Sequence, residues 1–146
     1  RGGVDTTEPR RLLFRRVVDR GHRFAVVVDP WSFVAEPVRI GEGAQILAGA
    51  VIQPDTEIGV NAIINTGASV DHDCIIGAHA HIAVGARVSG GVKIGAGVHV
   101  GAGACVIHGV EIGEGSIIGA GTVVTEDIPE HVVAVGVPAR ILRKVQ

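Results

Sequence analysis

The sequence predicts an all-β fold in which short parallel strands stack into a three-sided column, with one helix before it. Every sixth residue from Val34 to Val124 is Val or Ile, sixteen times without a break. The position four residues after each of these, from Val38 to Ile128, also holds a small or β-branched residue. Glycine recurs every eighteen residues, or three hexads, which indicates three sides for each coil: Gly41, Gly59, Gly77, Gly95 and Gly113.

The six-residue period excludes a helix between residues 34 and 129. A helix turns about 100° per residue and would scatter these aliphatic side chains over separate stripes, whereas a strand returns alternate residues to one face. Each hexad therefore supplies two inward residues and three residues that turn a corner, where glycine is favoured because it tolerates φ > 0. Such coils are typical of parallel β-helices, and the sixteen hexads predict just over five of them.

A helix is predicted for residues 6–21, ahead of the column. Thr6 or Thr7 can cap it, Pro9 suits its first turn, and Gly21 suits its C-terminal end. Several arginines line the helix, and we expect them to form a solvated face.

Two segments flank the column, which spans residues 34–129. Residues 23–28 predict one short strand without a partner sheet, so residues 1–33 are interpreted as the end of an incomplete preceding domain. After Pro129 the hexads stop, and residues 130–146 are expected to close the open end of the column.

Composition excludes several classes of function. A net charge of −2 and an aromatic content of 3% argue against a nucleic-acid binder. The two cysteines do not indicate a disulfide framework. No apolar run reaches the roughly 20 residues that span a bilayer, and no cleavable signal opens the chain. The chain is therefore interpreted as a cytoplasmic protein that makes no membrane contact.

The histidines are the candidate catalytic residues. His72 lies at a corner in the run Asp71-His72-Asp73-Cys74, and Asp73 is the expected partner that orients its imidazole, because both lie in one turn. Taken alone, each histidine is more simply an exposed turn or face residue. His81 points outward from a flat side that we expect another subunit to cover, because its column includes apolar residues: Gln45, Ile63, His81, His99 and Ile117.

The hexads containing INTGASVDHDCIIGAHAHIAVGARVSGGVKIGAGVHVGAGACVIHG and the ending VVAVGVPAR resemble the sugar O- and N-acetyltransferases of the sialic-acid and bacillosamine type. This resemblance implies a left-handed parallel β-helix, a homotrimer, and acetyl-CoA bound between neighbouring chains. It implies that residues 1–33 are the remnant of a nucleotide-sugar-binding domain. It makes His72 the catalytic base and Asp73 its acidic partner, where some members have Glu.

The resemblance also implies the residues that bind the co-substrate. His81 falls where the family has a histidine near the thioester carbonyl, and backbone contacts to CoA fall near Gly90, Ala102 and Ala120. Since nine residues are half a coil, we expect each site to join His72 of one chain to His81 of its neighbour. Cys74 is predicted to point inward, so direct transfer without an acyl-enzyme is expected.

The predicted function is therefore transfer of an acetyl group from acetyl-CoA to an amino or hydroxyl group of a nucleotide-linked amino sugar, without a metal. Two other interpretations stay open at this stage. A non-catalytic hexad scaffold would make the histidines incidental. A zinc carbonic anhydrase on a triangular β-helix would need three imidazoles at one metal, and the closely spaced histidine pair of that family is absent.

Overall fold

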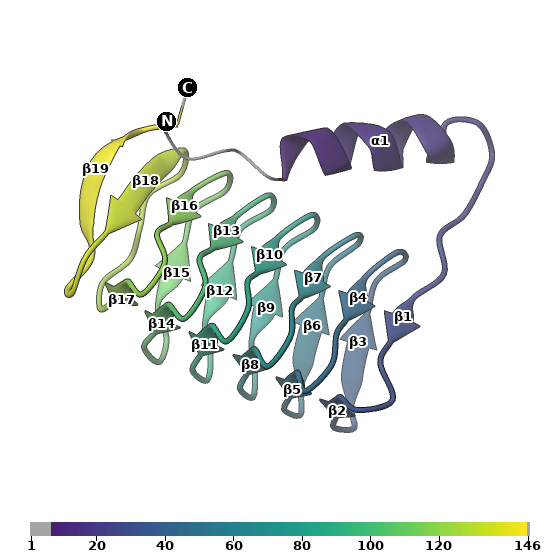
Figure 1. The fold of residues 1–146 in the computed structure, drawn as a ribbon, viewed down its shortest axis with the longest axis horizontal. Helices are drawn as coiled ribbons and strands as arrows, with labels where there is room; N and C mark the ends of the chain where they lie inside the picture. The colour runs from purple at the N-terminus through teal and green to yellow at the C-terminus, as the bar shows by residue number, and fades with distance from the viewer. Residues whose placement is uncertain (1–6, 146) are drawn as a thin grey trace.

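The computed structural model describes residues 7–145, and in this part the chain forms one helix, α1 (Glu8–Val18), and a column of stacked coils (Figure 1). Each coil contributes one short strand to each of three sheets, here named sheets A, B and C. Sheet A holds β1 (Val27–Val28), β4 (Gln45–Ile46), β7 (Ile63–Ile64), β10 (His81–Ile82), β13 (His99–Val100), β16 (Ile117–Ile118), β18 (Val132–Val135) and β19 (Arg140–Lys144). Sheet B holds β2 (Phe33–Val34), β5 (Val51–Ile52), β8 (Ser69–Val70), β11 (Arg87–Val88), β14 (Cys105–Val106) and β17 (Val123–Val124). Sheet C holds β3 (Val38–Ile40), β6 (Thr56–Ile58), β9 (Ile75–Ile76), β12 (Lys93–Ile94) and β15 (Glu111–Ile112).

The pairing register confirms the three-sided column. His81 of β10 pairs in parallel with Ile63 one coil before it and with His99 one coil after it, so paired residues are eighteen apart. The predicted strand without a partner sheet is wrong, because Val27 of β1 pairs with Gln45 of β4. The column therefore starts before Val34 and gains a strand at the N-terminal end of sheet A.

The inward hexad positions form a continuous apolar core. Their side chains are buried throughout the middle coils, and the first ones, such as Val34 and Ile40, are half-buried because the column is open there. Each fully buried Val or Ile stabilises the fold by roughly 1.5–3 kcal/mol. Short polar residues that replace aliphatics find partners inside, as Ser116 does by donating its hydroxyl hydrogen to the Pro129 carbonyl at 2.6 Å.

Glycine has two separate uses at the corners. The residue with positive φ recurs every six positions, as at Gly67 (φ 64°) and Gly85 (φ 66°), and this series includes Asp73 (φ 57°). The eighteen-residue series serves another purpose, because a Cβ on Gly59 or Gly77 would lie 2.5 Å from a backbone nitrogen of the next coil. The close approach of successive coils, rather than a positive φ, excludes side chains at that series.

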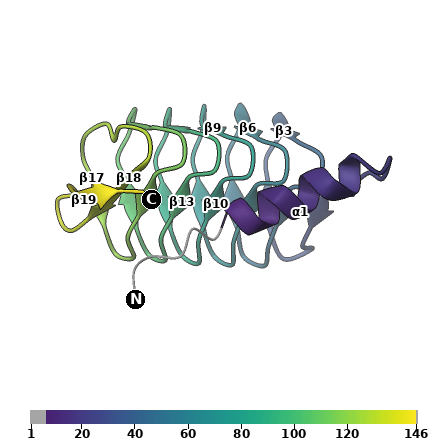
Figure 2. The same cartoon turned by 90° about the horizontal axis from the view of Figure 1, so that it is seen from above.

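Helix α1 runs along the column past several coils, beside the corner where sheet C turns into sheet A (Figure 2). It is shorter than predicted, since it ends at Val18 and a turn leads to Gly21 (φ 83°). Thr7 occupies the N-cap position without capping, because its hydroxyl donates to the Gly97 carbonyl at 3.0 Å. The other predicted cap, Thr6, lies outside the described residues.

One arginine of α1 departs from the predicted solvated face. The Arg10 guanidinium donates to the carbonyls of Asn61 and His79, the latter at 2.6 Å, so it anchors the helix to two successive coils. Phe14 extends this contact by stacking on Phe24, with ring centroids 4.6 Å apart. The assignment of residues 1–33 to a nucleotide-sugar-binding domain stays a prediction.

The far end of the column is closed by the last two strands. β18 pairs in parallel with β16 and continues sheet A, and β19 folds back antiparallel on β18. Ala134 is fully buried there, whereas the side chains of β19 are exposed. No helix within residues 7–145 has the length and apolar character needed to cross a membrane.

Candidate active site

His72 lies at the corner where sheet B turns into sheet C, here called the His72 corner. The chain leaves β8 at Val70, turns through residues 71–73 and enters β9. The backbone at this turn is tied to both neighbouring coils: Asp73 donates its N–H to the Pro54 carbonyl at 3.1 Å, and Gly91 donates to the His72 carbonyl at 2.9 Å. The backbone is therefore fixed while the His72 side chain, 54% exposed, faces outward.

The predicted pairing of His72 with Asp73 is present in the structure. Nδ1 of His72 lies 2.7 Å from Oδ2 of Asp73, so the carboxylate accepts the Nδ1 proton and Nε2 is left as the basic nitrogen. The hydrogen bond to Asp73 raises the pKa of His72, and the nearby charge of Asp71 raises it further. Asp71 also accepts the His72 backbone N–H at 2.9 Å through Oδ1.

Gly90 makes room for the imidazole one coil further along the column. A Cβ at this position would lie 2.8 Å from both Cε1 and Nε2 of His72, so the ring lies directly over the glycine. Gly90 thus has a role that sequence reasoning missed, beyond its predicted contact with CoA. The signal is its place in the corner column, eighteen residues after His72.

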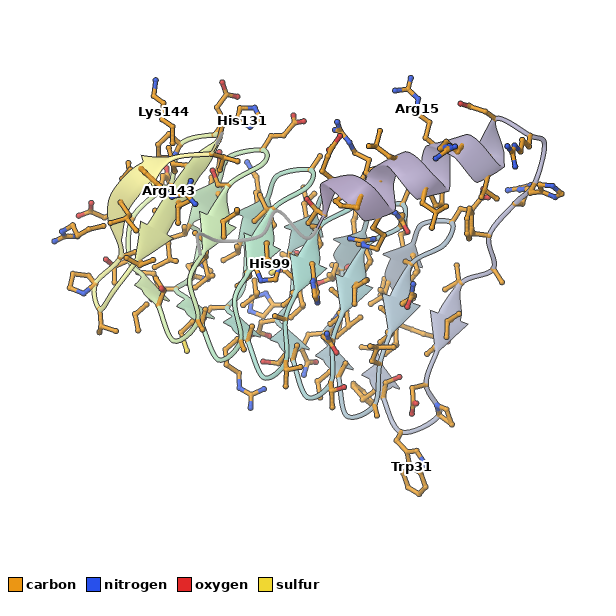
Figure 3. All side chains as sticks on the ribbon, turned by 45° about the horizontal axis from the view of Figure 1, so that its top comes forward. Arg15, Trp31, His99, His131, Arg143 and Lys144 are labelled. Carbon is orange, nitrogen blue, oxygen red and sulfur yellow. The ribbon has the colours of Figure 1, made fainter. Side chains whose placement is uncertain are left out.

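His81 lies on the outer face of sheet A in a different environment. Nδ2 of Asn65 lies 3.0 Å from its Nε2, and its ring packs edge-on against His99 with centroids 4.9 Å apart. Figure 3 labels His99 on this outer face. Burial lowers the pKa of His81 to about 4, and the charges of His99 and Arg10 contribute. His81 is therefore neutral at pH 7 and retains one ring N–H that can donate a hydrogen bond.

Ala102 and Ala120 lie at the remaining corner, where sheet A turns into sheet B. They occupy successive coils, and Gly121 donates its N–H to the Ala102 carbonyl at 2.9 Å. Both alanines are exposed, and their small side chains leave the backbone of this corner open to a ligand.

One chain does not bring all the predicted site residues together. His72, Asp73 and Gly90 meet at the corner between sheets B and C. His81 lies on sheet A, the third side of the column. Asn65 was not predicted as a partner of His81, although a sixteen-residue spacing places it one coil earlier.

The other candidate chemistries find less support in the geometry. Cys74 is fully buried, its Sγ donates to the Ser89 carbonyl at 3.1 Å, and burial raises the pKa of its thiol, which disfavours a nucleophilic role. Among residues 7–145, no three His, Cys, Asp or Glu side chains are grouped as a metal site. His79 instead contacts Asn61, with 2.9 Å between its Nδ1 and the amide Nδ2.

Known proteins similar to this chain are transferases. Residues 91–126 match the family model for bacterial transferase hexapeptide (six repeats). A comparison with curated protein sequences finds no match. Among solved structures, PerB from Caulobacter crescentus, in complex with CoA and GDP-perosamine, is 44% identical with a TM-score of 0.92, over 94% of this chain and 67% of that chain.

Two further structures agree with this one. The acetyltransferase domain of PglB from Neisseria gonorrhoeae is 35% identical with a TM-score of 0.92, over 95% of this chain and 68% of that chain. WeeI from Acinetobacter baumannii is 30% identical with a TM-score of 0.91, over 95% of this chain and 68% of that chain. The chain thus spans about two thirds of the length of these relatives.

The neighbours confirm the left-handed winding that the resemblance implied. Because these relatives are acetyltransferases, neither the scaffold nor the carbonic anhydrase interpretation is retained. The chain belongs to the hexapeptide-repeat family of sugar acetyltransferases with a left-handed β-helix, as its six-residue sequence period, its three-sided column and these similarities together show.

Proposed function

We propose that this chain transfers the acetyl group of acetyl-CoA to the amino group of a nucleotide-linked amino sugar in the cytoplasm. The observation that carries the proposal is the His72–Asp73 pair at an exposed corner, with Nδ1 held at 2.7 Å from the carboxylate and Nε2 left basic. The similarity to PerB, whose structure contains CoA and GDP-perosamine, supports this substrate class.

The proposed reaction is a direct transfer between the two substrates. The amine nitrogen attacks the thioester carbonyl carbon, so that a C–N bond forms while the C–S bond breaks. His72 takes a proton from the nitrogen through Nε2 and returns it to the departing CoA sulfur. Asp73 keeps the other ring proton on Nδ1 and stabilises the imidazolium that forms between these two transfers.

The developing oxyanion needs a hydrogen-bond donor, and His81 is the proposed side chain for this role. Its pKa of about 4 keeps it neutral, so it can donate a hydrogen bond without acting as a competing base. In one chain it lies on a different sheet from His72. We therefore place each site between two chains of a homotrimer, with Gly90, Ala102 and Ala120 lining the path of CoA.

A CoA-release assay tests the function. The protein is incubated with acetyl-CoA and a panel of nucleotide-linked amino sugars, including GDP-perosamine, and free thiol and acetylated product are both measured. Stoichiometric release of CoA and formation of an N-acetyl product are expected for at least one acceptor. If no acceptor in the panel yields an acetylated product, the proposed activity is wrong.

Mixed trimers test the shared site. His72→Ala chains and His81→Ala chains are each expected to be nearly inactive, but mixing them under conditions that exchange subunits restores some sites with both histidines intact. Recovery of activity on mixing, with none for either parent incubated alone, is the expected result. Mixtures that exchange subunits, as mass spectrometry can verify, yet stay inactive would exclude a site built from two chains.

A further inference from the structure

Helix α1 begins beside a row of backbone carbonyls at the corner where sheet C turns into sheet A. The residues of this row are eighteen apart: Asn61, His79 and Gly97. Successive coils pair at this corner through the residue before each of them. His79 donates its N–H to the Val60 carbonyl at 2.7 Å. Gly97 likewise donates to the Ala78 carbonyl at 2.8 Å, so the carbonyls of the row itself face donors from α1 instead.

Arg10 and Thr7 supply the donors for this row. The Arg10 guanidinium uses its two terminal nitrogens separately, because Nη1 donates to the Asn61 carbonyl and Nη2 donates to that of His79 at 2.6 Å. The Thr7 hydroxyl donates to the Gly97 carbonyl at 3.0 Å. Neighbouring strands lie about 4.8 Å apart, a gap that the planar fork of an arginine can bridge. Arg10 thus ties two successive coils together.

The same guanidinium reaches the peptide unit that carries His81. Nη2 of Arg10 lies 3.5 Å from the Ala80 carbonyl oxygen, a longer contact than an ordinary hydrogen bond. That oxygen also accepts the Ile63 N–H at 2.9 Å, and the His81 N–H of the same peptide unit donates to the Val98 carbonyl at 2.8 Å. The peptide plane at the start of β10 is therefore held by both neighbouring coils and by α1. This plane sets the direction in which the His81 side chain leaves the strand.

The environment of the His81 ring requires it to be neutral. The Thr66 backbone N–H donates to Oδ1 of Asn65 at 2.7 Å, so the amide nitrogen Nδ2 faces Nε2 of His81 at 3.0 Å. An amide nitrogen only donates, so Nε2 accepts and the ring proton lies on Nδ1. Burial lowers the pKa of His81 to about 4, with contributions first from His99 and then from Arg10. Arg10 is therefore close enough to act on this imidazole by its charge as well as through the backbone.

Arg11, the next residue of α1, has a different environment. Its side chain is exposed, and its Nε lies 3.0 Å from a carboxylate oxygen of Glu8, three residues earlier. Burial lowers the pKa of His79, and the charges of Arg10 and Arg11 lower it further. Of these two arginines, only Arg10 contributes to the lowered pKa of His81. Arg11 is therefore a matched control for Arg10.

We infer that Arg10 is a positioning residue of the active site: through the two carbonyls that it binds, it holds the coil that carries His81. The inference rests on the proposed function and deepens it, since it gives a helix outside the repeat a part in the chemistry. Arg10 acts through β10, whose first residue is His81. The buried core of the column starts at Ala44, and α1 has no buried residue. Loss of the Arg10 contacts should therefore displace His81 without unfolding the coils.

Kinetics and NMR titration of the imidazoles test the inference. Arg10→Met removes the donors and the charge but keeps most of the length of the side chain. Its kcat is expected to fall about tenfold or more, because a displaced hydrogen-bond donor loses its geometry, while the KM for the acceptor stays within about twofold. The pKa of His81 should rise from about 4 toward its ordinary value. Arg11→Met should raise the pKa of His79 but leave that of His81, and kcat, unchanged.

A second variant separates the charge from the two-pronged contact. Arg10→Lys keeps the charge but presents one nitrogen in place of the fork. It is expected to keep the pKa of His81 near the wild-type value and to recover part of the lost kcat.

Four results would overturn the inference: wild-type kcat in Arg10→Met, unfolding of its column as seen by circular dichroism, equal impairment of Arg10→Lys and Arg10→Met in both measurements, or an equal effect of Arg11→Met on His81. If the wild type releases no CoA with any acceptor, the proposed function fails. The pKa of His81 in Arg10→Met then still decides whether Arg10 holds this coil.

Discussion

His72 and His81 are nine residues apart on one scaffold, yet the fold places their imidazoles in environments that shift the two pKa values in opposite directions. His72 projects from a corner, more than half exposed, and the hydrogen bond to Asp73 raises its pKa. His81 lies on the flat side of sheet A, half-buried against His99, and its pKa is lowered to about 4. One imidazole is thus prepared to take a proton and the other to stay neutral.

The difference follows from where each residue lies in a coil. On a flat side, strands are about 4.8 Å apart, so an outward side chain packs against the residues above and below it. His81 accordingly contacts His99, and burial disfavours its charged form. At the corner, Gly90 has no side chain and so leaves room for the His72 ring, and two acids contact His72 in place of packing neighbours. Position in the repeat decides which histidine is a base.

Removal of the His72 imidazole is expected to have the largest effect on activity. His72→Ala is expected to lower kcat by roughly 10²–10⁴-fold, the usual effect of losing a general base, while the affinity for CoA is retained. His108→Ala is the matched control, because His108 is an exposed histidine in the same corner column, two coils further on. Near wild-type turnover by His72→Ala, or an equal loss in the control, would remove His72 from the mechanism.

Alanine substitutions at Gly90 and Gly77 are expected to affect different properties, catalysis in the first case and stability in the second. Gly90→Ala pushes its Cβ against the movable His72 ring, so we expect an intact fold and a fall in kcat of about tenfold or more, because a base displaced by an ångström loses its geometry. Gly77→Ala meets the backbone nitrogen of Ala96 at 2.5 Å, which cannot yield, and is expected to cost about 1–3 kcal/mol of stability.

Steady-state kinetics and denaturant unfolding check this pair of variants. If Gly90→Ala keeps full activity, the His72 ring does not lie over the glycine. If Gly77→Ala unfolds at the wild-type denaturant concentration, the close approach of the coils at Gly77 does not limit stability.

The column and the His72–Asp73 pair were predictable because the repeat fixes both. A six-residue period assigns every residue to a flat side or a corner, and adjacent corner residues such as His72 and Asp73 share a turn. The same period could have placed β1 in the column, since Val28 stands six residues before Val34 and eighteen before Ile46.

The contacts of α1 were not predictable in this way. The helix lies outside the repeat, so no periodicity indicates that Arg10 reaches the Asn61 and His79 carbonyls. A charged residue on a short helix is usually solvated. Only the packing of the helix against the column distinguishes Arg10 from its neighbours. The contact of Asn65 with His81 likewise depends on side-chain reach between neighbouring coils, which spacing alone does not decide.

Asp73 offers a milder change at the same corner. Because its hydrogen bond is the largest cause of the raised pKa of His72, Asp73→Asn should lower that pKa and move the acidic limb of the kcat/KM profile to lower pH. The plateau at high pH should also fall, because Nδ1 loses the carboxylate that holds its proton. Asp55→Asn, which removes the charge with the smallest effect on this pKa, is expected to move the limb less. A pH–rate profile with an unchanged limb in Asp73→Asn would contradict this origin of the raised pKa.

The smallest expected effect concerns stability at the flat side. The folded-state pKa of His81, about 4, is below its ordinary value, so between roughly pH 6.5 and 4 the unfolded chain binds a proton that the folded chain does not. Stability from this site is therefore present at pH 7 and decreases as the pH falls through that window. With allowance for solvent screening of a half-buried group, the loss between pH 7 and 5 is about 1 kcal/mol per chain.

His81→Gln should reduce the loss by that amount in denaturant unfolding at a fixed protein concentration. His72, with its raised pKa, acts in the opposite sense, so His72→Gln should make the loss slightly greater. If His81→Gln and wild type lose equal stability on acidification, His81 is not held neutral by its surroundings.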